Sequence, residues 1–165
     1  MKFKITLKVD RNYGDLLPFN YQYEQSAVIY RILAQADTQY SSWLHENGYL
    51  LHERKRFKLF CYSPFIFEKV RPLPEAGCLK IIGERAVWYI SFIPEKSTLE
   101  FIQGIFAHQS FTIGNKKYQV AFDVVGVEAI PMPQLSEGMT FVALSPICVK
   151  LHEDNKCLFI NMVDS

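Results

Sequence analysis

The first ten residues alternate between apolar and polar side chains. This period of two predicts a β-strand over residues 2–10, with one face in the core and the other open. The core face carries Phe3, Ile5, Leu7 and Val9, and the open face carries Lys2, Lys4, Thr6 and Lys8. Three lysines along an open sheet face can hold a chain of phosphates, and a merely solvated face is the alternative.

A helical pattern follows this strand and a tyrosine-rich loop. Ser26 is a suitable N-cap for a helix over residues 27–36, because its hydroxyl can accept from a free N–H of the first turn. The apolar stripe of this helix consists of Ile29, Leu33 and Ala36. Tyr30 lies about 100° from Ile29, at the edge of that stripe.

A second, shorter helical pattern begins after Asp37, which is suited to cap it, and Gly48 ends it. The spacing turns Tyr40, Trp43 and Leu44 inward. His45 follows this buried group by one residue, so we expect it at the margin of the apolar face, in the last turn.

The remaining patterns alternate between strands and one more helix. Residues 56–67 have strand composition broken by Pro64, and residues 78–82 and 85–93 predict a β-hairpin that turns at Gly83 and Glu84. Residues 94–109 predict a helix with Leu99, Ile102 and Phe106 on one face. Two strands, 111–113 and 118–130, follow around a turn at residues 114–115.

This order of elements predicts the fold class. A β-α-β-β-α-β series in which both helices cover one face of an antiparallel sheet is typical of an α+β, ferredoxin-like (RRM-like) sandwich. We assign residues 1–139 to this domain. Residues 140–165 hold further strand-like segments, and we expect them to be the strand or hairpin entry to a second domain.

Charge changes this picture locally. The chain of 165 residues has a net charge of +1, which argues against a protein that coats nucleic acid non-specifically. Residues 51–72, however, hold six lysines and arginines against two glutamates. The apolar runs are too short to cross a membrane and the N-terminus lacks the apolar block of a signal peptide, so a cytoplasmic protein is expected.

Cysteine and histidine spacing predicts no metal or other cofactor. Cys61, Cys78, Cys148 and Cys157 are far apart and form no CxxC pair, so we expect buried, reduced thiols. The four histidines form neither an HxxxH nor an HExxH pattern.

Five stretches in order along the chain carry a resemblance to a known family. They are MKFKITLK at residues 1–8, LLPFNYQYEQSAVIYRIL at 16–33, SSWLHE at 41–46, RFKLFCYSPF at 56–65 and FVALSPICVK at 141–150. Together they resemble the CRISPR-associated endoribonucleases of the RAMP superfamily, which cut precursor CRISPR RNA within its repeats. The resemblance implies two tandem ferredoxin-like domains, the second ending in a glycine-rich loop.

No glycine-rich stretch follows Gly138, so we expect a second domain that lacks most of its length. An incomplete second sheet would expose an edge strand, which predicts a homodimer or aggregation through the tail. CRISPR repeat RNA, or the precursor CRISPR RNA that contains it, is the implied substrate. Other CRISPR effector proteins are further expected partners.

The resemblance also implies catalytic residues. RNA can be cut without a metal when a base takes the proton of its 2′-hydroxyl, an acid protonates the leaving 5′-oxygen and a cation stabilises the phosphorane. Family members commonly use Tyr, His and Lys, and the matching positions are Tyr30, His45 and Lys58. We expect His45 to act as acid or base, Lys58 to stabilise charge and Tyr30 to orient or assist proton transfer. The products would carry 2′,3′-cyclic phosphate and 5′-hydroxyl ends.

Each assignment has a structural alternative. His45 could be a capping or surface residue, Tyr30 a packing residue and Lys58 a solvent-facing strand lysine, while His52 is a second candidate for the role of His45. Arg54, Lys55 and Arg56 are expected to position phosphates, together with Lys2, Lys4 and Lys8, and a solvated loop is the alternative.

Two other functions compete with the nuclease. A non-catalytic RAMP subunit that binds RNA inside a CRISPR effector complex would share the fold and the cations. A ferredoxin-like small-molecule enzyme or regulatory module would need a compact pocket instead. Catalysis requires that Tyr30, His45 and Lys58 lie within about 10 Å of one another, since one phosphate must contact all three.

Overall fold

The computed structural model describes residues 1–51, 55–131, 133–134, 136–140, 147–150 and 157–160. The chain divides into two compact units, Met1–Met132 and Pro133–Ser165. The larger unit contains all three helices and the main sheet, and the smaller contains two paired strands, β12 (Ile147–Lys150) and β13 (Cys157–Ile160).

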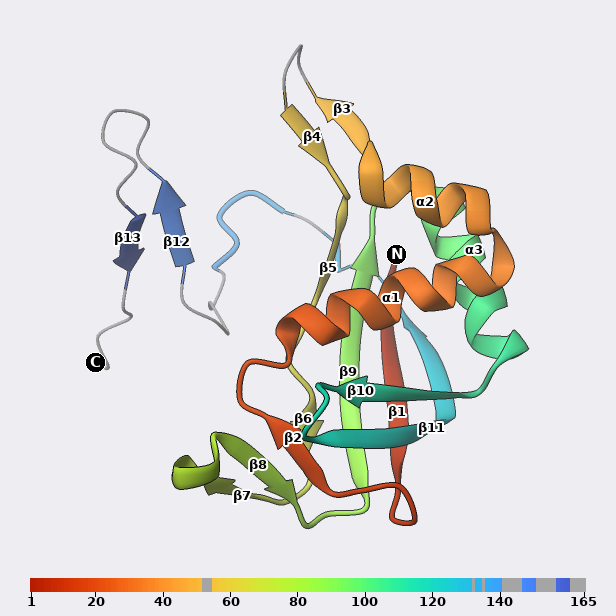
Figure 1. Cartoon of the computed structure of the whole chain (residues 1–165). Coiled ribbons are helices and arrows are strands. Elements are labelled where there is room, and N and C mark those ends of the chain that lie inside the picture. The colour runs from red at the N-terminus through yellow and green to blue at the C-terminus, as the bar shows by residue number, and fades with distance from the viewer. Residues whose placement is uncertain (52–54, 132, 135, 141–146, 151–156, 161–165) are drawn as a thin grey trace. The chain divides into compact units, whose positions relative to one another are not determined.

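The main sheet of the larger unit has β1 (Lys2–Asp10) at its centre (Figure 1). Strands β9 (Arg85–Phe92) and β11 (Gln119–Ile130) flank it, and both run antiparallel to it. Strand β10 (Ser110–Gly114) extends the sheet beyond β11, while β5 (Phe60–Tyr62) and β6 (Ile66–Phe67) both pair with the outer side of β9.

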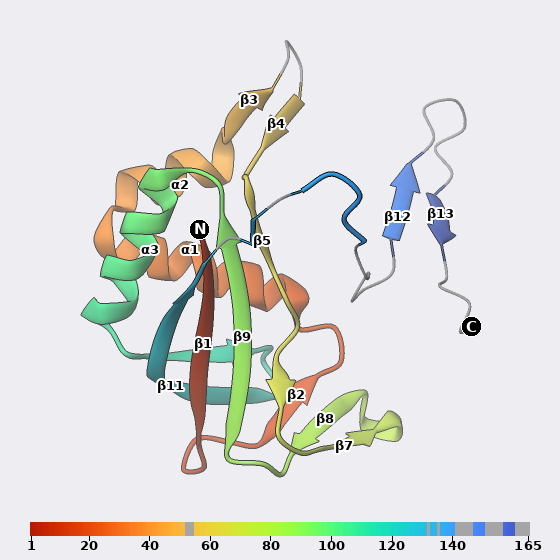
Figure 2. The same cartoon turned by 180° about the vertical axis from the view of Figure 1, so that it is seen from behind.

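Three helices lie on one face of this sheet: α1 (Gln22–Ala36), α2 (Thr38–Glu46) and α3 (Glu95–Ala107). The opposite face is uncovered by helices in the view from behind (Figure 2). The alternation predicted for β1 is confirmed, since Phe3, Ile5, Leu7 and Val9 are all buried against the helices. The lysines of β1 therefore point to the open face.

Helices α1 and α3 approach each other closely at Gly104. A Cβ atom at this position would lie 1.8 Å from the main-chain oxygen of Ile32 in α1. Only a glycine permits this approach, because any side chain would overlap the backbone of the neighbouring helix.

Two smaller sheets flank the main one. Strands β2 (Leu16–Pro18), β8 (Cys78–Ile81) and β7 (Val70–Leu73) form one, with a short 3₁₀ turn at Pro74–Ala76 between β7 and β8. Strands β3 (Tyr49–Leu51) and β4 (Lys55–Phe57) form the other. The sequence between Tyr49 and Arg56 predicts a loop, and the pairing of β3 with β4 shows that this prediction is wrong at the strand residues.

The predicted hairpin between residues 78–82 and 85–93 is also wrong. Both strands exist, but β8 pairs with β2 and β7, whereas β9 pairs with β1, β5 and β6. Distant groups bind the segment between them: Arg11 donates to the main-chain oxygens of residues 81–83, and the main-chain nitrogens of Ile82 and Gly83 donate to the oxygen of Lys69. These contacts separate the two strands.

The helix predicted over residues 94–109 is confirmed as α3, but the face that carries Leu99, Ile102 and Phe106 is not its buried face. Leu99 and Phe106 are exposed, and the buried residues are Ser97, Thr98, Phe101, Gly104 and Ile105. Helix α1 likewise begins five positions before the predicted start, so Ser26 lies inside it. Its predicted core residues Ile29 and Leu33 are buried.

The observed architecture is a mixed α/β fold built on an antiparallel sheet, in agreement with the predicted class. A four-stranded β-α-β-β-α-β series leaves out the further short strands β2, β3, β4, β6, β7, β8 and β10. Of the two cysteines whose surroundings are described, Cys78 is buried as expected, but Cys61 is exposed because it points to the open face of β5. No helix of the described residues is long and apolar enough to span a membrane.

Candidate active site

The candidate site forms at the end of α2, and the sequence defines both ends of this helix. The side chain of Asp37 accepts a hydrogen bond of 2.8 Å from the main-chain nitrogen of Tyr40, as predicted for an N-cap. Gly48 ends the helix with a φ of +69°, a left-handed conformation that favours glycine. The main-chain nitrogens of Asn47 and Gly48 both donate to the oxygen of Trp43.

Tyr30 of α1 and His45 of α2 form an aromatic pair at this point. Their ring centroids are 4.9 Å apart and their planes are nearly perpendicular, at 83°. Tyr30 is half-buried and also meets the edge of Phe60, whereas His45 is exposed. The pair thus presents an imidazole to solvent while packing holds its phenol partner.

A hydrogen bond between helices α1 and α2 fixes this pair. The hydroxyl of Ser41 donates to the main-chain oxygen of Tyr30 at 2.8 Å. Ser41 is buried and lies one turn before His45 in α2. The bond therefore couples the backbone of Tyr30 to the helix that carries His45.

Lys58 lies on the other side of His45, in the segment between β4 and β5. Its ammonium group donates to the main-chain oxygens of Leu44 and His45, at the end of α2 where free carbonyls give the helix its negative pole. Gly48 permits this approach, since a Cβ there would lie 2.7 Å from the oxygen of Phe57. One of the three ammonium donors stays available after these two bonds.

Burial shifts the acidity of two of these groups. Burial, and secondarily the neighbouring Tyr62, raises the pKa of the Tyr30 hydroxyl, so this group stays protonated at neutral pH. Burial lowers the pKa of the Lys58 ammonium, and the positive charge of Arg56 lowers it further. Next to Lys58, Leu59 has a φ of +55°, which is unusual for a branched residue.

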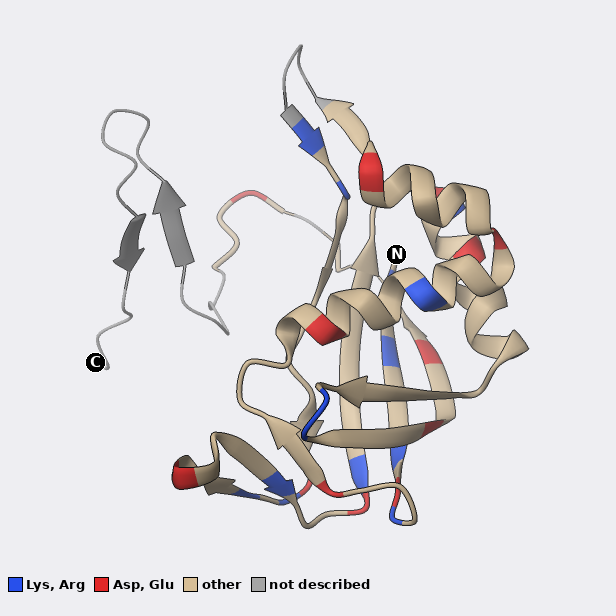
Figure 3. Cartoon of the chain, in the orientation of Figure 1, with Lys and Arg blue, Asp and Glu red and all other residues tan. Residues whose placement is uncertain are grey.

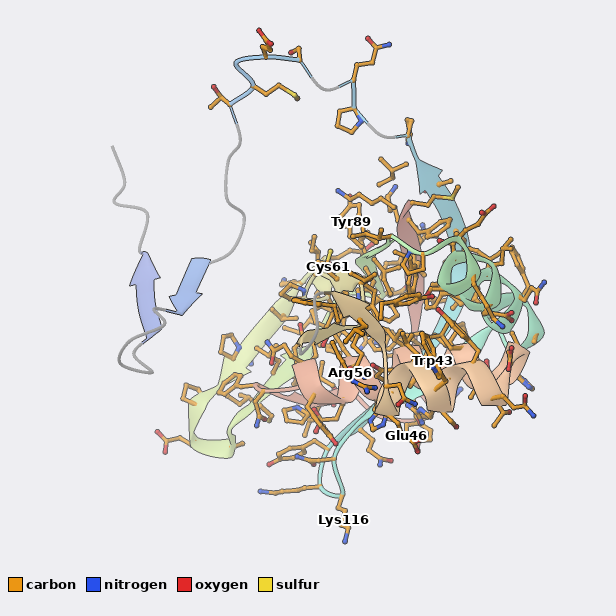
Figure 4. The ribbon with its side chains drawn as sticks, turned by 90° about the horizontal axis from the view of Figure 1, so that it is seen from above. Trp43, Glu46, Arg56, Cys61, Tyr89 and Lys116 are labelled. Carbon is orange, nitrogen blue, oxygen red and sulfur yellow. The ribbon has the colours of Figure 1, made fainter. Side chains whose placement is uncertain are left out.

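The remaining predicted cations of this region lie on or near β4. Arg56 is exposed and donates to the side-chain oxygen of Asn47 at 3.0 Å, which places it beside the end of α2 near Glu46 (Figure 4). Lys55 belongs to β4, but its side chain lies outside the described residues, as do Arg54 and the alternative histidine His52. Among the described residues, no three His, Cys, Asp or Glu side chains form a metal-binding cluster.

The alternation of β1 puts its lysines on the open face of the sheet, opposite the helices that carry Tyr30 and His45. Figure 3 shows blue segments on β1 and, apart from them, on β4. The ammonium of Lys4 forms an ion pair of 3.0 Å with Glu128, and that of Lys2 lies 5.1 Å from the ring centroid of Tyr89. Lys8 is exposed and in register with Arg85 and Asp123. The structure therefore separates the two predicted groups of cations.

Comparison with known proteins places this geometry in a family. Residues 16–123, which include Tyr30, His45 and Lys58, match the family described as CRISPR-associated protein Cas6, N-terminal. The chain belongs to the Cas6 family. The matched region contains all three helices and most of the main sheet.

Two curated Cas6 proteins resemble the chain over most of its length. The CRISPR-associated endoribonuclease Cas6 of Pyrococcus furiosus is 26% identical over 158 residues, which cover 94% of this chain and 55% of that protein. The endoribonuclease Cas6 1 of Methanocaldococcus jannaschii is 25% identical over 147 residues, covering 89% and 52%. The chain thus spans about half the length of these Cas6 relatives.

Solved structures agree with this placement. A Cas6-related protein from Pyrococcus furiosus superposes with a TM-score of 0.71 at 25% identity, and the match covers 99% of this chain and 63% of that one. A RAMP protein described as binding different RNA substrates superposes with a TM-score of 0.68 at 24% identity, with coverage of 99% and 62%. The second likeness shows the fold alone.

Within this Cas6-family chain, sequence reasoning missed the residues that hold the candidate site together. Ser41, Gly48 and Asn47 contact it through main-chain atoms or short polar side chains. One signal was present, because Ser41 falls on the same helical stripe as Tyr40 and Leu44, where a small polar residue is unexpected. A second missed group is the contact between the hydroxyls of Tyr40 and the buried Ser97, which joins α2 to α3.

Proposed function

We propose that this chain is the N-terminal part of an endoribonuclease that cuts CRISPR repeat RNA, or its precursor, without a metal ion. The observation that carries the proposal is the pairing of Tyr30 with the exposed His45, whose main-chain oxygen accepts from Lys58. Tyr30 and Lys58 thus each contact His45, which supports a site in which all three side chains reach one phosphate. The names of the two Cas6 relatives support the same activity.

The proposed reaction is attack of the RNA's own 2′-hydroxyl on the adjacent phosphorus. The 2′-oxygen bonds to phosphorus while its proton passes to a base, and the bond to the 5′-oxygen breaks as that oxygen takes a proton from an acid. This leaves one product with a 2′,3′-cyclic phosphate and the other with a 5′-hydroxyl. Atoms and charge balance without any further reactant.

The three side chains suit different parts of this reaction. Histidine is the side chain whose ordinary protonation change lies near neutrality, so His45 is the proposed acid or base. Tyr30 keeps its proton, so it orients or assists as a donor. Lys58 would stabilise the phosphorane through its remaining donor, and its other two donors position the backbone that carries His45.

We also propose the finer arrangement of the fold. The main sheet and helices would form a ferredoxin-like domain over residues 1–139, with β1, β5, β9 and β11 as its four principal strands. Residues 140–165 would then begin a second such domain, and dimerisation through this tail and contact with other CRISPR effector proteins are part of the same proposal. Arg54, Lys55 and Arg56 would position phosphates near the cut.

The experiment is incubation of the chain with a labelled hairpin repeat RNA in EDTA, with analysis of the product ends. We expect cleavage to a 2′,3′-cyclic phosphate that is lost in His45→Ala. His108→Ala is the matched control, because His108 is also exposed and lies at the C-terminal end of another helix, α3. Equal cleavage by both variants would remove His45 from the mechanism.

One observation favours a second function, the non-catalytic RNA-binding RAMP subunit. The ammonium of Lys58 is already bound by two carbonyls, as expected of a residue that only stabilises the end of α2. This alternative predicts that the chain binds the repeat RNA with no cleavage in EDTA, and that His45→Ala binds as tightly as the parent chain.

A further inference from the structure

A second surface of the larger unit combines cations with exposed aromatic rings. It consists of two clefts. One, of about 430 Å³, lies between α1 and β10, and the other, of about 380 Å³, lies between the β1–β2 loop and the β10–β11 turn. Tyr23, Arg31 and Thr112 line the larger, and Tyr13, Lys117 and Tyr118 line the smaller. Gln119 lines both, so the two clefts meet at this residue, and we call them together the α1–β10 groove.

The β10–β11 turn forms one end of this groove in a fixed conformation. The side-chain oxygen of Asn115 accepts from the main-chain nitrogens of Lys117 and Tyr118, at 2.8 and 2.9 Å. Lys117 places its ammonium 4.8 Å from the ring centroid of Tyr118, while Lys116 projects into solvent (Figure 4). The turn therefore presents two ammonium groups and an aromatic ring in a pre-formed arrangement, which lowers the entropic cost of binding.

Exposed tyrosines line the rest of the groove. Tyr23 is 82% exposed and Tyr13 is 51% exposed, values that leave ring faces open to solvent. The hydroxyl of Tyr13 donates to the side chain of Gln119 at 2.9 Å, which holds this ring against the turn. Large aromatic side chains with open faces beside cations are the composition that binds unpaired bases and their phosphates.

The acidic residues of the groove do not cancel its positive charge. Asp15 lines the smaller cleft, but Lys80 approaches its carboxylate to 3.6 Å. Glu24 lines the larger cleft together with Arg31. Lys116 and Lys117 remain in excess, on an exposed turn where a phosphate can reach them.

The groove is aligned with the candidate active site through α1. Tyr23 and Tyr30 are seven residues apart in this helix, so they share a face and lie about 10 Å apart along its axis. A strand that passes His45 and Tyr30 can continue along this face to Tyr23 and then to the β10–β11 turn.

We propose that the α1–β10 groove binds the single-stranded part of the RNA that flanks the cut, with Lys116 and Lys117 on phosphates and Tyr23 stacked on a base. The identity of the ligand rests on the proposed function, but the location of the groove does not depend on cleavage. Because stacking and phosphate contacts dominate, the groove binds with little base preference.

The test is the affinity for fluorescein-labelled oligouridine RNA at several salt concentrations, measured by anisotropy on the chain carrying His45→Ala so that no cleavage occurs. Adding Lys116→Gln and Lys117→Gln removes two phosphate contacts. The slope of log K against log salt then becomes shallower by about 1.4, since each contact to a single strand contributes about 0.7. Tyr23→Leu weakens binding at least about fivefold, whereas Tyr23→Phe, which keeps the ring, binds as the parent does.

A comparison pair, Lys2→Gln with Lys8→Gln, removes the same charge from the open face of β1. An unchanged slope in the Lys116 and Lys117 variant overturns the proposal, and a loss confined to the β1 pair would place the RNA on the open face. Failure of the parent to bind oligouridine overturns it as well. If the Lys116 and Lys117 variant cleaves repeat RNA as fast as the parent, the groove proposal is wrong and the nuclease proposal stands. If RNA binds through these lysines but is not cleaved, the nuclease proposal is wrong and the groove proposal stands.

Discussion

The ammonium group of Lys58 donates to the main-chain oxygen of His45, the residue whose ring packs against Tyr30. The lysine therefore holds the backbone that carries the histidine, and its neighbour Gly48 leaves room for it to do so. This contact makes Lys58 a stabilising residue of the site whatever else it does in a reaction.

The first prediction concerns this lysine. Lys58→Met removes the donor to two carbonyls at the C-terminal end of α2, so we expect the free energy of unfolding to fall by about 1 kcal/mol. Lys58→Arg keeps the charge and should recover most of that loss. Urea unfolding of the three proteins is the measurement, and a Lys58→Met midpoint equal to that of the parent would contradict a stabilising role.

The second prediction concerns the hydroxyl of Tyr30. Tyr30→Phe keeps the aromatic contacts with His45 and Phe60, so folding should be unaffected, but it removes a donor that burial keeps protonated. We expect RNA cleavage to slow by about 10²-fold, the lower range for loss of a group that assists proton transfer. Single-turnover kinetics check this, and a rate within twofold of the parent would assign Tyr30 to packing.

The third prediction concerns the contact between α1 and α3. Gly104→Ala places a methyl group on the main-chain oxygen of Ile32, and relieving that overlap requires the helices to separate. We expect a loss of about 2 kcal/mol or more, as for other overpacked cores. Gly126→Ala is the control, because a Cβ there meets only the side chain of Thr6, at 3.7 Å. Thermal unfolding should separate the two variants clearly.

The fourth prediction concerns pH. A hydrogen bond from the main-chain N–H of Tyr40, and then one from Lys96, lower the pKa of Asp37 below its ordinary value of 3.8. Between the lowered pKa and 3.8 the unfolded chain binds more protons than the folded chain. The ionised carboxylate of Asp37 therefore stabilises the fold above pH 3.8, and this stabilisation is lost as the pH falls through the lowered pKa.

Asp37→Asn tests this, because the amide still caps α2 but cannot take up a proton. We expect the parent to lose more stability than Asp37→Asn when the pH is lowered from about 6 to about 3. Urea midpoints at the two pH values are the measurement. Identical losses would show that the charge of Asp37 does not contribute.

Local sequence patterns predicted the helices and strands of this fold better than they predicted which strands pair with each other. The alternation of Phe3, Ile5, Leu7 and Val9 defined the central strand, and Asp37 and Gly48 defined the ends of α2. The partners of β8 depend on Arg11 and Lys69, which are distant in sequence, so the spacing around Gly83 could not reveal them.

The sequence pattern did not reveal which face of α3 is buried, for a related reason. Leu99, Ile102 and Phe106 form a more apolar stripe than the true buried face. The close approach of α1, however, requires Gly104, and the buried Ser97 contacts Tyr40 of α2. Steric fit between helices decided the orientation, and hydrophobicity alone could not.

The candidate site, too, was predicted only in part. The resemblance pointed to Tyr30, His45 and Lys58, and the structure brings these three together. It could not reveal that Lys58 uses two of its donors on backbone oxygens, because a main-chain acceptor leaves no trace in residue identity.

The bonds that fix the candidate site end on main-chain atoms, since Ser41 binds the oxygen of Tyr30 and Lys58 binds the oxygen of His45. Neither bond depends on which side chain occupies positions 30 and 45. The scaffold can therefore accept a different chemical group at either position while the backbone stays in place. Natural selection or protein design can therefore exchange the side chains at positions 30 and 45 one at a time while these backbone contacts are kept.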